Sequence, residues 1–201
     1  MKRLFLFLLV FVLLFSMCGC KSVPEKEMTQ TFSSFVSALK IYDRDAMTLL
    51  LTEFPDNTSY IYLDDIFNDE PYMKLYRNIY PNISYSVVSA EGNHLVVKVN
   101  MPNVQKLFTT VTAMVMAMVM DDASLKEKLA ENDENAIILN QELMLAMAGE
   151  GKYEMMEQEY TLSFDKKDGE VLLVCDDQLR SFMTGNFFLS KNMTVEDIAN
   201  S

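Results

Sequence analysis

The chain has 201 residues, 50% of them hydrophobic, and a formal net charge of −12 at pH 7. This length suits one domain rather than two, and the apolar content excludes a disordered chain. With 29 acidic residues against 17 basic ones, the composition argues against a nucleic-acid partner, because binding phosphates requires a basic surface.

Residues 1–19 have the features of a secretion signal. Two cations, Lys2 and Arg3, precede an uninterrupted apolar run from Leu4 to Phe15. A helix over this run reaches only about 18 Å, well short of the roughly 30 Å hydrocarbon core of a bilayer. The sequence therefore predicts a cleaved signal peptide rather than a permanent membrane span.

The signal peptide ends in Met17-Cys18-Gly19-Cys20. This motif resembles the lipobox of bacterial lipoproteins, in which a small residue precedes a cysteine that receives diacylglycerol and becomes the mature N-terminus. The resemblance implies that Cys20 is lipidated and that its fatty-acyl chains, palmitate among them, anchor the protein in the membrane. We then expect general export, a position on the outer face of the cytoplasmic membrane, and Cys175 as the remaining thiol. An ordinary cleaved signal peptide with incidental cysteines is the alternative.

The mature chain divides into a short linker, a domain and a tail. We place the lipid anchor and linker at residues 20–27, the folded domain at 28–189 and a polar C-terminal tail at 190–201. Fully extended, the polar residues after the lipidated cysteine span only about 20 Å, so the domain would sit close to the membrane.

Three helices are expected at the start of the domain. Apolar residues recur at helical spacing over residues 32–42, which predicts an amphipathic helix. Asp43 can cap a short second helix that ends before Pro55. A third helix should run from Asp69, a plausible N-cap, to Pro81, with tyrosines along one side.

Two β-hairpins follow, separated by a helical insertion. Residues 82–100 and 156–175 alternate apolar with polar side chains around the turns Glu91-Gly92-Asn93 and Asp168-Gly169, which predicts four antiparallel strands. The insertion, residues 103–150, reads as helical with a polar break at 132–135 and a stop at its glycines. A closing helix can be capped by Asp176 or Asp177.

The predicted fold class is α+β. The element order resembles the NTF2-like (cystatin-like α+β) cone, in which N-terminal helices pack on a curved antiparallel sheet. More narrowly, it is similar to NTF2-like domains of lipoproteins of unknown function in Gram-positive bacteria. The likeness is carried, besides the lipobox cysteine, by three segments: FSSFVSALKIYDRDAM, ISYSVVSAEGNHLVVKVNMPN and EYTLSFDKKDGEVLLVCDDQL.

Methionines alternate along the insertion at Met114, Met116, Met118 and Met120. Thioethers suit Cu(I), but on a helix these four split into two pairs on different sides. Flexible methionines that fill a buried helix explain the same pattern, and we favour this interpretation over a copper site. No phosphate-binding or zinc-finger spacing occurs either, so we expect neither a metal nor a cofactor.

The resemblance also implies where chemistry would reside. NTF2-like enzymes such as the ketosteroid isomerases use a carboxylate base and phenolic donors inside the cone. In this chain only Tyr60, Tyr62, Asp64 and Asp65, beside the tyrosines of the third helix, could imitate that arrangement, and none aligns with a catalytic motif. The single histidine, His94, follows a hairpin turn and should be exposed. Cys175 has the parity of the buried residues in its strand and should be buried.

The leading hypothesis is a non-catalytic module, and not an enzyme, that binds an apolar small ligand or a partner protein of the cell envelope. The alternative is an isomerase or dehydratase with Asp64 or Asp65 as the base. A third role is envelope assembly with the insertion as a docking face, and a homodimer through the outer sheet face is compatible with the sequence. The expected cavity lining consists of Phe35, Tyr72, Tyr76, Tyr80 and Tyr160.

Overall fold

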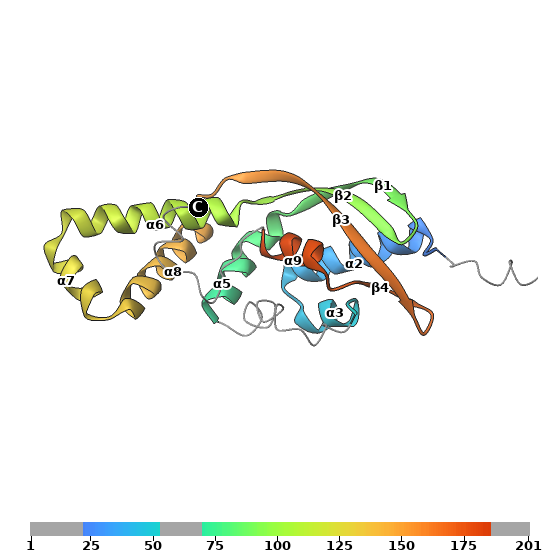
Figure 1. The fold of residues 1–201 in the computed structure, drawn as a ribbon, viewed down its shortest axis with the longest axis horizontal. Helices are drawn as coiled ribbons and strands as arrows, with labels where there is room; N and C mark the ends of the chain where they lie inside the picture. Colours follow the sequence, from blue (N-terminus) through green and yellow to red (C-terminus); the bar gives the residue numbers. More distant parts are fainter. Residues whose placement is uncertain (1–21, 53–69, 186–201) are drawn as a thin grey trace, which may run out of the picture.

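The computed structural model describes residues 22–52 and 70–185 (Figure 1). In these two ranges, seven α-helices and a four-stranded antiparallel sheet form an elongated molecule with a body at one end and a helical arm at the other. The predicted α+β class is confirmed.

The N-terminal helices are α2 (Glu25–Ile41), α3 (Arg44–Leu49) and α5 (Glu70–Ile79), which continues into a 3-10 turn. The linker expected over 20–27 is shorter, because α2 already begins at Glu25. The Pro24 carbonyl accepts the first helical N–H groups, and acidic residues in the first turn favour that end of the helix dipole. Asp43 caps α3 as predicted, accepting a hydrogen bond from the Ala46 N–H at 3.0 Å.

Both predicted hairpins are present and pair into one sheet in the order β1-β2-β3-β4. The strands are β1 (Ser84–Glu91), β2 (His94–Pro102), β3 (Met155–Lys167) and β4 (Glu170–Leu173). Gly92 makes the first turn at a φ of 60°, which glycine adopts without the steric cost other residues meet. The last strand ends two residues before Cys175, because the Cys175 N–H donates to the Thr52 hydroxyl and not to β3.

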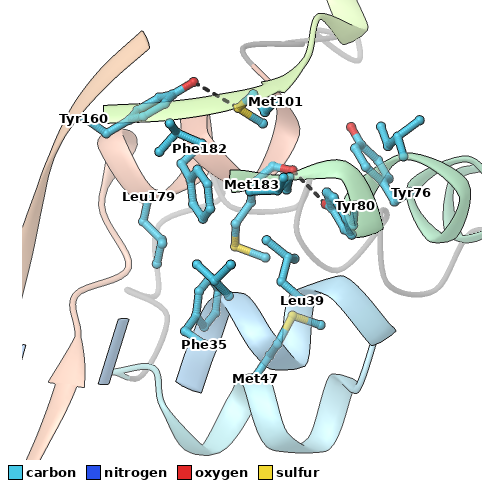
Figure 2. Packing of buried hydrophobic residues seen from close by; sticks show 14 of the residues in the cluster. Phe35, Leu39, Met47, Tyr76, Tyr80, Met101, Tyr160, Leu179, Phe182 and Met183 are labelled. Atoms are coloured by element: carbon cyan, nitrogen blue, oxygen red, sulfur yellow. Dashed lines mark hydrogen bonds between the residues drawn. The ribbon is translucent and has the colours of Figure 1, made fainter. Parts of the chain in front are cut away.

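The core lies between the inner face of the sheet and helices α2 and α9 (Asp177–Thr184). Alternate residues of β2 and β3 point inward, and α9 packs against β3, so that Phe182 and Met183 lie between sheet and helices (Figure 2). Asp176, one of the two residues predicted to cap the closing helix, caps α9 by accepting a hydrogen bond from the Leu179 N–H at 2.9 Å. The outer face of the sheet is polar and carries the Lys98–Glu157 ion pair.

The insertion forms an arm of three helices, α6 (Val104–Asp121), α7 (Ala123–Glu131) and α8 (Asp133–Gly149) (Figure 1). Helix α8 returns along α6 and also packs on α5. The polar break predicted over 132–135 is confined to Asn132, because α8 already starts at the next residue. The arm is attached to the sheet where two strands pair. Pro102 of β2 faces Met155 of β3, and the Asn103 N–H donates to the Glu154 carbonyl at 2.9 Å.

Candidate functional site

The space between sheet and helices, where an NTF2-like cone would hold a ligand, is occupied by packed side chains. Phe182 is fully buried, and its ring centroid lies 5.6 Å from that of Phe32, 6.4 Å from that of Phe35 and 5.7 Å from that of Tyr160. The methionines Met47 and Met183 lie in the same layer (Figure 2). Phe35 and Tyr160, two expected cavity residues, thus belong to this aromatic cluster.

Two further expected residues, Tyr76 and Tyr80, stack with their centroids 4.9 Å apart and are buried. The Tyr80 hydroxyl donates to the Met183 carbonyl at 2.7 Å, and the Tyr76 hydroxyl donates to the Thr184 carbonyl at 3.3 Å. The last carbonyls of a helix lack partners within it, so these phenols complete the C-terminal end of α9. Both hydroxyls therefore find their partners inside the fold. Burial raises the pKa of Tyr80, and neighbouring phenols add to the effect.

Tyr72 belongs to the first turn of α5. Asp64, Asp65, Tyr60 and Tyr62 lie outside the described residues, and so does the lipidation candidate Cys20. The catalytic alternative and the lipid anchor stay predictions.

Cys175 is buried, as predicted, with 4% of its surface exposed. Its thiol donates to the Thr52 carbonyl at 3.2 Å, and burial raises its pKa to about 11. A thiol that stays protonated at neutral pH is a poor nucleophile. His94 is exposed, again as predicted, and its Nδ1 lies 3.4 Å from the hydroxyl of Ser163, its cross-strand partner. Within residues 22–52 and 70–185, no group of three His, Cys, Asp or Glu side chains is arranged to hold a metal ion.

Most of the exposed large hydrophobic residues of the described ranges belong to the arm. Met114, Met116 and Met118 are each more than 40% exposed, and Met120 is 86% exposed. The interpretation of these methionines as buried core residues is wrong. Only one face of α6 meets the rest of the fold, and the residues of that face are Val104, Leu107, Val111 and Val115.

Helix α6 is long and apolar enough to cross a membrane, and it is the one helix in the described ranges that passes this test of length and composition. In the fold, only four of its 18 residues are buried. A helix that is apolar on every side normally lies in a core or in a bilayer, so α6 has more apolar surface than its own chain covers.

No protein-family model matches the chain, and no curated protein matches it. Among solved structures, the chain is similar to the crystal structure of a candidate lipoprotein, YcdA, from Bacillus subtilis, with 14% sequence identity and a TM-score of 0.44. The match covers 80% of this chain and 56% of YcdA, so the chain spans little more than half the length of that protein.

Proposed function

We propose that the chain is a lipid-anchored protein on the outer face of the cytoplasmic membrane, with an NTF2-like body that carries the arm as a binding surface for another protein. The observation that carries this proposal is the contrast between a body whose interior is filled with side chains and an arm, residues 104–149, that leaves six large apolar residues uncovered. Exposed apolar patches of this kind mark interaction surfaces.

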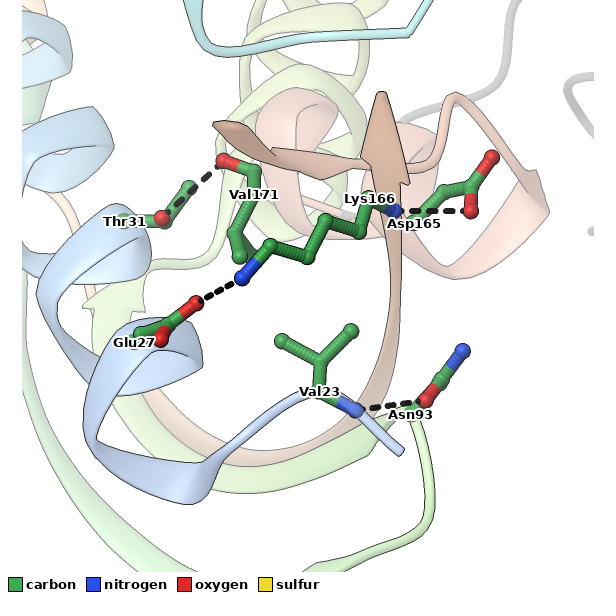
Figure 3. Close-up of polar contacts among 7 residues, drawn as sticks. All are labelled: Val23, Glu27, Thr31, Asn93, Asp165, Lys166 and Val171. Atoms are coloured by element: carbon green, nitrogen blue, oxygen red, sulfur yellow. Dashed lines mark hydrogen bonds and ion pairs between the residues drawn. The ribbon is translucent and has the colours of Figure 1, made fainter. Parts of the chain in front are cut away.

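The anchor is supported by the signal peptide and by Cys20, and the fold is compatible with a short tether. The Val23 N–H donates to Asn93 Oδ1 at 2.9 Å in the β1–β2 turn, and the Val23 side chain is buried (Figure 3). Glu27 pairs with Lys166 of β3 at 2.8 Å. Two residues lie between Cys20 and Val23, so a lipid on Cys20 would hold Val23, at the β1–β2 turn, within about 10 Å of its attachment point.

A protein partner is favoured over an apolar small ligand, because a ligand pocket needs space among its lining residues. Four of the five expected lining residues are fully buried core residues, and the rings of all four contact other aromatic rings. The uncovered methionines lie on an arm that projects from the body (Figure 1), which suits a second macromolecule better than a small molecule.

The anchor is tested with Cys20→Ala in cells grown with a clickable fatty acid. We expect the parent to be labelled and to sediment with membranes, and the variant to lose the label. A variant that keeps both the label and its membrane association would refute the anchor.

The binding surface is tested by placing a photoreactive amino acid at Met116 on the arm and, as a control, at Thr161 on the outer sheet face. We expect cross-linked protein from the arm position and little from the control. Equal cross-linking at both positions, or none at the arm, would count against the arm as the binding surface.

A further inference from the structure

The arm concentrates the apolar surface of the described chain. Ten large hydrophobic residues are exposed in the described ranges, and six of them belong to the arm: Met114, Met116, Met118, Met120, Ile137 and Ile138. Together they expose surface equal to about three whole side chains, roughly 600 Å². A standard protein interface buries about 800 Å² on each partner, so the methionines on one side of α6 supply part of the area that a stable dimer needs, and neighbouring residues of the arm must supply the rest.

The uncovered surface extends to both sides of the arm. No charged residue occurs between Lys106 and Asp121. Because alternate residues on a helix point about 200° apart, Met114 and Met118 lie beside the face that meets α8, whereas Met116 and Met120 lie on the opposite side of the helix. Helix α8 contributes two more exposed apolar residues to this surface, Ile137 and Ile138.

A bilayer is a poor occupant for this surface because the tip of the arm is charged. Residues 121–134 contain six acidic and two basic residues: Asp121, Asp122, Glu127, Glu131, Asp133, Glu134, Lys126 and Lys128. Passage of the helical pair through a membrane would carry these charges into hydrocarbon, at a cost of a few kcal/mol for each at the centre. The acidic excess would also be repelled by anionic lipid headgroups.

The opposite end of the arm has a smaller, basic excess: four basic residues lie there with Glu150 and Glu154, and Glu150 is paired with Lys152 at 2.6 Å. Lys106 lies in the first turn of α6, and Lys74 and Arg77 are exposed on α5, which packs against α8. The end of α8 lies beside this part of α5, since a methyl group on Gly149 would come 3.9 Å from the Asn78 amide nitrogen. The tip of the arm is acidic and the end that joins the body is basic, so a second arm that runs in the opposite direction would have complementary charges.

We propose that the occupant is a second copy of this chain, with the two arms packed antiparallel into a four-helix bundle around a two-fold axis. In this arrangement the acidic tip of each arm lies beside the basic, body-proximal end of the other, and the methionine-rich middle sections of the two arms pack together. This inference rests on the proposed function, since it names the protein that the arm binds.

The test is sedimentation velocity of the chain from Lys21 onward, which contains every element that the structure describes. We expect a dimer at about 10 µM. Two variants, Met114→Glu/Met118→Glu and Met116→Glu/Met120→Glu, place charge on either side of α6. At least one should weaken the dimer ten-fold or more, whereas the matched control Ile41→Glu/Leu49→Glu, at exposed hydrophobic residues of the body, should not. A parent protein that stays monomeric, or a dimer that only the control disrupts, would overturn the proposal.

Orientation is tested by mixing chains that carry Lys106→Cys with chains that carry Met120→Cys and adding a flexible bis-maleimide. Cys175 is buried and should not react in the folded state. Antiparallel arms predict cross-links mainly between the two different variants, while cross-links mainly within the Met120→Cys chains would show parallel arms and overturn the proposal.

Two further outcomes separate this inference from the proposed function. A monomer whose arm cross-links a different protein in cells would refute the dimer and leave the arm as a binding surface. A monomer that floats with phosphatidylglycerol vesicles, and loses this binding in the methionine variants, would refute both the dimer and the protein partner.

Discussion

The packed interior makes a quantitative prediction for Phe182→Ala. Phe182 is fully buried on α9, and its ring lies in the aromatic cluster between the sheet and α2. Truncating a buried phenylalanine to alanine costs about 3–5 kcal/mol, through lost transfer free energy and the cavity left behind. We expect about 4 kcal/mol, because rings on several sides of Phe182 are held by other elements and cannot collapse into the space.

The measurement is urea-induced unfolding of the chain from Lys21 onward, followed by circular dichroism, with the free energy of unfolding taken from linear extrapolation. Phe182→Leu is the matched control and should cost about 1–2 kcal/mol, since it keeps much of the apolar volume. A domain of ordinary stability, about 5–15 kcal/mol, would remain measurable after either change.

A ligand experiment extends the test. An empty apolar cavity in a protein core can take up benzene, so benzene should raise the melting temperature of Phe182→Ala and leave the parent unchanged. A loss of less than about 1 kcal/mol on truncation, or a parent that benzene already stabilises, would indicate an open interior and refute the packing argument.

Three other changes have defined outcomes. Gly185→Ala should lower the free energy of unfolding in urea by about 2–3 kcal/mol, more than Gly92→Ala does. Both glycines have a positive φ, but a methyl group at Gly185 would lie 2.8 Å from the Val104 side chain, whereas a methyl group at Gly92 would meet open space. Tyr80→Phe should cost about 1–2 kcal/mol by leaving a buried carbonyl of α9 without its donor, and an unchanged unfolding midpoint would contradict this. Because burial raises the pKa of Cys175 from 9.0 to about 11, the unfolded state ionises first as pH rises, so stability should hold below pH 9 and fall by about 1 kcal/mol by pH 10. Cys175→Ala should reduce this fall but not abolish it, because the raised pKa values of Tyr42 and Tyr80 act in the same direction, and a fall of equal size in the variant would assign it to other groups.

The elements of the body could be predicted from local patterns. The turns at Gly92 and Gly169 are encoded by a change to a period of two around turn-forming residues, and the caps at Asp43 and Asp176 by a short polar side chain before an apolar repeat. Each of these signals lies within a few residues of the structure it determines.

The environment of the side chains could not be predicted in the same way. Tyr80 and the carbonyl it binds are 103 residues apart, and no local pattern encodes that pairing. The methionines of α6 form an uncharged run that reads alike in a core helix and in an uncovered one. Whether such a run is buried depends on what packs against it, and here α8 meets only one face.

The attachment of the arm has a mechanical consequence. Helix α6 follows β2 with only its N-cap Asn103 between them, and the chain re-enters β3 opposite Pro102 after a turn at residues 150–154, so α6 starts directly from a hydrogen-bonded strand pair. A surface held this stiffly loses little conformational freedom on association, which favours affinity for a given contact area. It also acts as a lever, because a load applied at its tip is carried into the two central strands of the sheet.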